Sequence, residues 1–336
     1  MCGVLQSSDA QGQCAPHQPY SVSDVPIEFF SDHSPGGRLR LVGTLSVPQW
    51  KGEPPARRPG ILLLHGSGPQ SRAGRISGDI KGRYAQPVPV LKDLARALGE
   101  RGYTVLRYDK RTCTARADPS CVYSAESARA ATWADLVGDV RAAARALRKR
   151  PEVTELIVVG HSQGGTLALE TLGDTEPSAL VLLAGTHSPI QDVIGRQLVW
   201  LAQQKAPQLS VKERALAQAQ VQAALRTLEE IAAGRAPAGQ VFLNAPASFW
   251  RGWMASSAQT DAWLTQYTGP LLYMGGGDDV NVDDVERLRY LEALSRRQEG
   301  QAVILPELSH ALHRRHGPGR VDPAVVEMLL EWLEER

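Results

Sequence analysis

The sequence contains little that would suit a membrane or a nucleic acid. No apolar run among its 336 residues approaches the 18 residues that a membrane-spanning helix needs. A net charge of +1 gives no field that would attract nucleic acid or anionic lipid. The N-terminus lacks a basic segment followed by an apolar one, so we expect no signal peptide in the chain as given. Hydrophobic and charged fractions of 43% and 22% are ordinary for a globular protein.

Cysteine is scarce, and its four copies form two local pairs, Cys2 with Cys14 and Cys113 with Cys121. An even number at short range is compatible with two disulfides in an exported protein. A bridge between Cys113 and Cys121 would contribute roughly 2–3 kcal/mol on the chain-entropy model. Four reduced thiols in a cytosolic enzyme fit equally well, so localisation stays open between the cytoplasm and export.

The most informative stretch is residues 156–169. Residues 156–159 are Leu-Ile-Val-Val, which predicts a strand buried on both faces, and a helix rich in Ala and Leu is expected from Gln163 onward. Between them lies Gly-His-Ser-Gln-Gly at 160–164, the G-x-S-x-G nucleophile elbow. The turn is so tight that a Cβ at either glycine would collide with the opposite arm. We therefore expect Ser162 to present its hydroxyl above the sheet edge.

Strands and helices alternate along most of the chain, which indicates a parallel sheet flanked by helices. Residues 25–30 and 39–47 are expected to be antiparallel edge strands, and residues 60–64 to begin the parallel part. We predict a flexible lead-in over residues 1–24. The α/β core is predicted to comprise residues 25–187 and 268–336, with residues 188–267 as an insertion.

The insertion, residues 188–267, has no convincing strand and is rich in Ala, Gln and Leu, with helical spacing over residues 216–233. A segment this long cannot be a plain loop, so we predict a helical cap over the carboxyl edge of the sheet. Trp250, Trp253 and Trp263 cluster near its end. Packing within the cap is the favoured role for these rings, and substrate contact is the alternative.

A serine nucleophile needs a base and a carboxylate that orients the base. After a nucleophile elbow these residues are expected in the order Ser, acid, His, each in a loop that follows a core strand. The loop after residues 271–274 offers Asp279, with the adjacent Asp278 as the alternative. The loop after residues 303–305 offers His310, with His187 as its rival. The sequence thus predicts a triad of Ser162, His310 and Asp279.

The remaining histidines are given other roles. His161 is fixed within the elbow and cannot turn back to its neighbour's hydroxyl. His313 and His316 lie in a basic stretch and are expected to be solvated, and His65 is expected to brace its loop.

An oxyanion hole needs two backbone N–H groups. Gln163, at the start of the helix after the elbow, is one expected donor. The other should come from the loop after the first parallel strand, which reads His-Gly-Ser-Gly-Pro at 65–69. We assign it to Ser67, with Gly68 as the alternative.

The chain resembles the α/β-hydrolase superfamily, and within it the bacterial esterases that carry His-Gly-Ser-Gly-Pro after the first parallel strand. Three more segments share the likeness, namely residues 106–111, 279–282 and 308–310. The resemblance implies hydrolysis of carboxylic esters without a metal or an organic cofactor, and it implies that Asp109 and Arg111 support the site structurally. Residues 70–75 and 112–121 depart from the group's pattern at the expected mouth of the cleft.

We therefore expect a serine hydrolase that forms an acyl-enzyme with a small-molecule ester. Activity should fall below roughly pH 6–7, because a protonated imidazole cannot accept the serine proton. A peptidase, a thioesterase or an acyltransferase could use the same triad, and a catalytically silent binding protein is the alternative from another class. Acyl chain length, alcohol and oligomeric state stay open.

Overall fold

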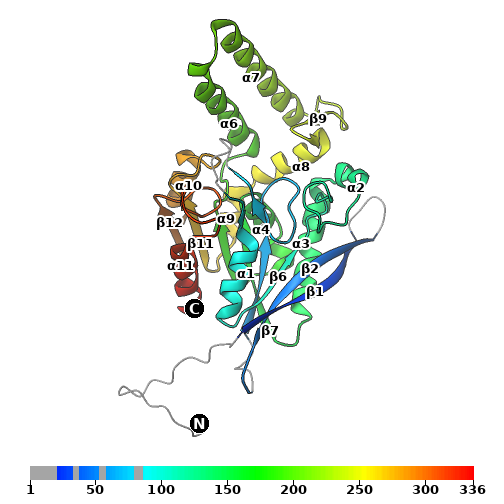
Figure 1. Cartoon of the computed structure of the whole chain (residues 1–336), viewed down its shortest axis with the longest axis vertical. Helices are drawn as coiled ribbons and strands as arrows, with labels where there is room; N and C mark the ends of the chain where they lie inside the picture. The colour runs from blue at the N-terminus through cyan, green and yellow to red at the C-terminus, as the bar shows by residue number, and fades with distance from the viewer. Residues whose placement is uncertain (1–20, 33–37, 53–57, 79–85) are drawn as a thin grey trace.

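A computed structural model describes residues 21–32, 38–52, 58–78 and 86–336 (Figure 1). Its centre is an eight-stranded sheet in the order β1-β2-β6-β3-β7-β8-β11-β12. The strands are β1 (Ser21–Ser31), β2 (Leu39–Gln49), β3 (Arg58–Leu64), β6 (Thr104–Tyr108), β7 (Val153–His161), β8 (Ala179–Leu183), β11 (Leu271–Gly276) and β12 (Gly300–Leu305). β1 and β2 pair antiparallel, β2 runs antiparallel to β6, and the other neighbours are parallel. This is the mostly parallel sheet that the alternation predicted.

Helices cover both faces of the sheet, because the central strands are apolar on both sides. α1 (Val90–Glu100) and α11 (Pro323–Glu334) pack on one face, where their leucines join Leu63 of β3 and Val105 of β6 in a buried cluster. α3 (Trp133–Arg148), α4 (Gln163–Glu170) and α10 (Asp284–Ser295) contribute to the cluster on the other face. Within the described residues no helix is both long and apolar enough to cross a membrane.

Several short elements of the structure were not predicted from the sequence. They are α2 (Ala125–Ala130), α5 (Leu172–Thr175) and the two-residue pair β4 (Arg75–Ile76) with β5 (Val88–Pro89). Each has four to six residues, or two in the case of the strands, which is too short for a periodic pattern to show. The expected flexible lead-in over residues 1–24 was wrong at its end, because residues 21–24 pair with β2 as the start of β1; its residues up to 20 lie outside the described residues.

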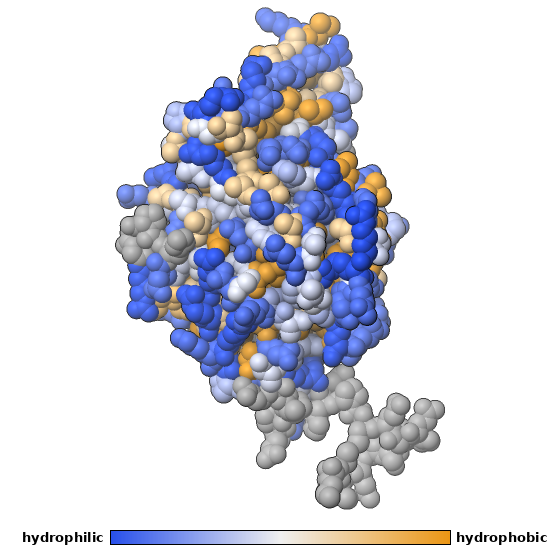
Figure 2. Space-filling view, turned by 180° about the vertical axis from the view of Figure 1, so that it is seen from behind, coloured by the Kyte–Doolittle hydropathy of each residue, from blue (hydrophilic) through white to orange (hydrophobic). Residues whose placement is uncertain are grey.

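The insertion contains α6 (Ile190–Lys205), the 3-10 turn η1 (Ala206–Gln208), α7 (Val211–Ala232), α8 (Ala247–Ser257) and α9 (Thr260–Gln266). Against expectation it also contains a minimal hairpin, β9 (Val241–Phe242) with β10 (Ala245–Pro246), which pairs by two residues a side around a positive-φ turn at Leu243 and Asn244. α6 and α7 project from the body of the molecule as a pair, hereafter the arm (Figure 1). The view from behind shows apolar groups among the hydrophilic ones at the arm's end (Figure 2).

Stacked aromatic rings join the insertion to the core. Trp253 of α8 stacks on Trp133 of α3, with ring centroids 5.5 Å apart and planes 4° apart, and Trp250 stacks on Trp253. Both insertion rings are buried, at 5% and 4% exposure, whereas Trp263 is half-buried. For Trp250 and Trp253 the predicted packing role is confirmed, because apolar area removed from water holds α8 on the sheet's helix layer.

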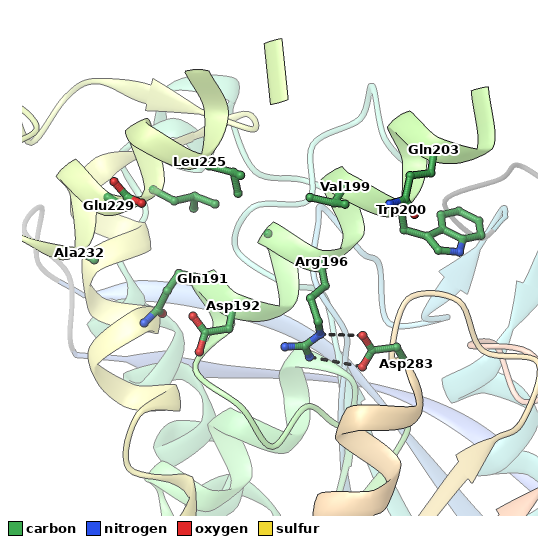
Figure 3. Close-up of a pocket in the computed structure, with 12 residues that line it drawn as sticks. Gln191, Asp192, Arg196, Val199, Trp200, Gln203, Leu225, Glu229, Ala232 and Asp283 are labelled. Carbon is green, nitrogen blue, oxygen red and sulfur yellow. Dashed lines mark hydrogen bonds and ion pairs between the residues drawn. The ribbon is translucent and has the colours of Figure 1, made fainter. Parts of the chain in front are cut away.

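The base of the arm is held by charge. Arg196 of α6 donates a hydrogen bond through Nε to the carboxylate of Asp283, the N-cap of α10, at 2.6 Å (Figure 3). Arg196 also forms an ion pair with Glu286. Glu286 is fully buried and accepts the backbone N–H groups of His187 and Ser188 at 2.5 and 2.7 Å. A buried carboxylate with three donors is satisfied, so the segment leading into α6 is fixed on α10.

Cys113 and Cys121 form a disulfide, with their Cα atoms 5.6 Å apart. It closes a small loop after β6. Asp118 in that loop accepts a hydrogen bond from Ser71 Oγ at 2.7 Å. Of the two alternatives for this pair, the structure therefore has the bridge. Cys2 and Cys14 lie outside the described residues.

Candidate active site

The turn between β7 and α4 has the geometry expected of an elbow. Ser162 adopts φ 53° and ψ −118°, a conformation that L-residues rarely take. A Cβ added at Gly160 would lie 2.4 Å from the Gly164 carbonyl oxygen, and one at Gly164 would lie 2.6 Å from the Leu64 carbonyl oxygen. Both distances are far below contact, so only glycine fits on either side of Ser162.

Two loops from distant parts of the chain meet beside this turn. His310 follows β12, and its Nδ1 lies 2.8 Å from Asp279 Oδ2 in the loop after β11. The backbone oxygen of His310 lies 2.8 Å from Nε2 of His161, the residue before Ser162. Side chains of all four residues are buried or nearly so. The structure thus brings the predicted acid and base together, against the elbow.

Asp279 is held firmly in place. Its Oδ1 accepts the backbone N–H groups of Asn281 and Val282 at 2.8 and 2.9 Å, which leaves Oδ2 for His310. A carboxylate fixed in this way orients the imidazole and keeps its proton on Nδ1. The other aspartate, Asp278, turns outward and bonds to Arg315 Nε at 2.9 Å.

The other histidines take structural positions. His187 Nε2 lies 3.2 Å from Asp261 of α9, and its ring meets Tyr290 edge-on. His65 Nε2 contacts the Tyr108 carbonyl oxygen at 2.5 Å, which braces the loop as expected. Burial lowers the pKa of His65 and of His161 to about 3, so both are neutral at ordinary pH.

One expectation about the histidines was wrong. His313 is 2% exposed, and its Nδ1 lies 2.6 Å from Ser309 Oγ, whereas His316 is exposed as predicted. The basic neighbours suggested a solvated stretch, but the chain folds back here, since Ser309 N–H donates to the His313 oxygen. That short turn buries residues 308–313 without a break, while Arg314 is exposed and Arg315 is half-buried.

The predicted oxyanion loop lies against the elbow. A Cβ at Gly66 would be 3.2 Å from Ser162 Cβ, so the peptide between residues 66 and 67 borders the nucleophile. Gln163 begins α4, and the first N–H groups of a helix have no partner within it. The Ser67 side chain is exposed, and the following Gly68 has φ +83°. These positions fit two backbone donors beside Ser162.

Asp109 and Arg111, which the resemblance implied to be structural supports of the site, both form ion pairs. Asp109 is fully buried, and its carboxylate accepts hydrogen bonds from Arg72 Nη2 and from the Arg72 backbone N–H, each at 2.7 Å. Arg111 pairs with Asp135 at 2.7 Å and with Asp139. The unexpected Arg72 thus supplies the charge that Asp109 needs.

Sequence reasoning overlooked Lys110. It is 3% exposed, and its Nζ donates to the Gly66 carbonyl oxygen at 2.8 Å and to Gln163 Oε1. Burial lowers its pKa to about 7. Its position directly after a central strand, at the carboxyl edge of the sheet, is the signal that could have identified it.

No cluster of three metal-ligating side chains occurs in the described part of the chain. A hollow of about 680 Å³ lies between α6 and α7, lined by apolar residues such as Leu225 and by Arg196 and Asp283 (Figure 3). The residues that line it include neither Ser162 nor His310.

Comparison with known proteins finds esterases and a peptidase that are similar to this chain. Esterase EstD of Thermotoga maritima is 26% identical over 302 residues, which span 87% of this chain and 65% of that protein. The structure of Est1E from Butyrivibrio proteoclasticus aligns with a TM-score of 0.53 at 16% identity, covering 92% of this chain and 99% of that one. The Pyrococcus horikoshii acylaminoacyl peptidase aligns with a TM-score of 0.58 at 13% identity, covering 94% and 41%. These structural likenesses establish an α/β-hydrolase fold.

The family described as "Hydrolase_4: Serine aminopeptidase, S33" matches residues 83–315, more than half of the chain. The match includes the elbow and both loops that carry the acid and the histidine. The protein therefore belongs to this family of α/β hydrolases.

Proposed function

We propose that this protein hydrolyses carboxylic esters of small molecules through an acyl-enzyme, with Ser162 as the nucleophile, His310 as the base and Asp279 as the orienting acid. The observation that carries the proposal is the 2.8 Å contact between His310 Nδ1 and Asp279 Oδ2, made beside the strained turn at Ser162. With the Nδ1 proton directed at the carboxylate, Nε2 is left to accept a proton. The name of the Thermotoga relative, an esterase, supports the choice of bond.

The reaction has two steps. His310 takes the hydroxyl proton as Ser162 Oγ attacks the ester carbonyl, and the N–H groups of Ser67 and Gln163 stabilise the oxyanion. The alcohol leaves with the proton from His310, which gives the acyl-enzyme. His310 then removes a proton from water as the water attacks the acyl carbonyl. His310 returns this proton to Ser162 Oγ as the acid is released, which regenerates the free enzyme.

A fluorophosphonate probe and a short p-nitrophenyl ester test this proposal. Ser162→Ala should abolish labelling and lower kcat by about 10⁴–10⁶-fold. Ser295→Ala, at an exposed serine on α10, should leave both unchanged. Hydrolysis by the Ser162 variant at the wild-type rate would refute the assignment.

The description of the matching family as a serine aminopeptidase motivates a second candidate, cleavage of aminoacyl amides with the same triad. A panel that pairs each p-nitrophenyl ester with the p-nitroanilide of the same acyl group separates the two. We expect the ester to have the higher kcat/KM. A higher kcat/KM for the anilides would favour the peptidase.

A further inference from the structure

Lys110 is a buried cation at the centre of the proposed site. Its ammonium group donates to two neutral oxygens, the carbonyl of Gly66 and the side-chain amide of Gln163. One acceptor belongs to the loop after β3 and the other to the first residue of α4. The ammonium group therefore joins the two segments that carry the two proposed oxyanion donors.

The bond to Gly66 acts on the Ser67 N–H through a shared peptide group. The Gly66 carbonyl and the Ser67 N–H belong to one planar unit, and in a trans peptide they point in opposite directions. The described residues contain no cis peptide bond. Lys110 Nζ donates a hydrogen bond to the Gly66 oxygen at 2.8 Å. This bond fixes the plane of the peptide group and hence the direction of the Ser67 N–H.

The same bond also polarises that peptide. A charged donor on a carbonyl oxygen strengthens the hydrogen bond that the amide makes on its far side, and in a dry environment the effect is larger. Lys110 is 3% exposed, so little water reaches it, and this desolvation lowers its pKa to about 7. When Lys110 is protonated, its charge is thus only weakly screened from an oxyanion that forms across the peptide.

We propose that Lys110 is the positioning residue of the oxyanion hole, where one buried ammonium group aligns the Ser67 peptide with α4 and strengthens the Ser67 N–H as a donor. The inference rests on the proposed ester hydrolysis. Because the negative charge exists only in the transition state and the tetrahedral intermediate, the contribution belongs to kcat and not to substrate binding.

The test compares Lys110→Met with Lys92→Met, the same change at an exposed lysine of α1. Kinetics are measured on a short p-nitrophenyl ester, together with the inhibition constant of an alkyl boronic acid, which forms a tetrahedral adduct with serine. Lys110→Met should lower kcat by about 10- to 10³-fold with little change in KM. Boronate binding should weaken by a similar factor, and Lys92→Met should match wild type.

Lys110→Gln guards against misfolding, because its amide keeps N–H donors without the charge. It should have a kcat between those of Lys110→Met and wild type, with thermal unfolding close to wild type. If Lys110→Met or Lys110→Gln folds and has wild-type kcat and boronate binding, the inference is overturned. A loss confined to KM would overturn it as well.

Failure of the proposed function would look different. In that case the wild-type protein would not hydrolyse esters in a Ser162-dependent way, whatever stands at position 110. Ser162-dependent hydrolysis combined with an unaffected Lys110→Met variant would sink this inference alone.

Discussion

Adjacent aspartates in the loop after β11 face different partners. Asp279 bonds to His310 and to two backbone N–H groups, while Asp278 pairs with Arg315 near the surface. Asp279→Asn should lower kcat by about 10⁴-fold, because an amide favours the wrong tautomer of His310. Asp278→Asn should keep kcat near wild type. Turnover of a p-nitrophenyl ester by the two variants shows which aspartate orients His310. Equal losses of kcat would contradict the assignment of Asp279.

The buried neutral histidines make stability depend on pH. Burial lowers the pKa of His65 from 6.5 to about 3. At pH values between these two, His65 is protonated in the unfolded chain and neutral in the folded chain. Stability is therefore full above pH 6.5 and falls as the pH drops toward 3. We expect His65→Gln to flatten this fall by up to about 1.4 kcal/mol per pH unit.

Urea unfolding at pH 7.5 and 5 measures the change, with His316→Gln, at an exposed site, as the control. The control should keep the wild-type dependence. An equal flattening in both variants would show that burial of His65 is not the cause.

At the scale of the element, the elbow depends on two close backbone approaches. Gly164→Ala would place a Cβ 2.6 Å from the Leu64 oxygen and 2.9 Å from the His65 oxygen, so β3 and α4 must move apart. We expect a loss of about 1–3 kcal/mol of stability together with a large loss of activity. Gly173→Ala in α5 meets nothing within 4 Å and should cost neither. Thermal unfolding and ester turnover compare the two, and a harmless Gly164→Ala would refute this account.

Strands were easier to predict than their surroundings. Residues 60–64 and 156–159 are apolar enough to be strands in a parallel sheet, and the structure has them within β3 and β7. By contrast, β9 and β10 exist only because Leu243 and Asn244 turn with positive φ and Trp250 Nε1 bonds to the Phe242 oxygen. Contacts of that kind leave no periodic trace in the sequence.

At the scale of the whole molecule, the arm makes few buried contacts with the rest of the described structure. α7 has 22 residues, yet only Leu228 and Ile231 are buried, and Val211 and Leu216 are 75% and 60% exposed. Regions with few buried contacts open at low free energy. We expect amides of residues 211–225 to exchange with deuterium much faster than those of β7.

A matched pair of leucines tests which contacts hold the arm. Leu228→Ala should speed exchange along α7, because truncating a buried leucine to alanine lowers the free energy of unfolding by about 2–5 kcal/mol. Leu216→Ala, at an exposed site, should leave exchange unchanged, and β7 should be unaffected in both variants. Slow exchange over residues 211–225 in the wild type would show that the arm is more firmly held than these contacts indicate.

The sequence by itself determined the sheet, the elbow and the order of acid and histidine, because apolar runs, paired glycines and residues at strand ends are local features. Only the tertiary structure decided which aspartate faces His310, that His313 is buried, and that Lys110 joins the loop at Gly66 to Gln163. The contacts of Asp279 and of Lys110 depend on how segments more than 30 residues apart approach one another, as His310 and Asp279 do across 31 residues, whereas His313 is buried by a turn back onto Ser309. Side-chain direction at such contacts is set by packing, which a linear pattern does not record.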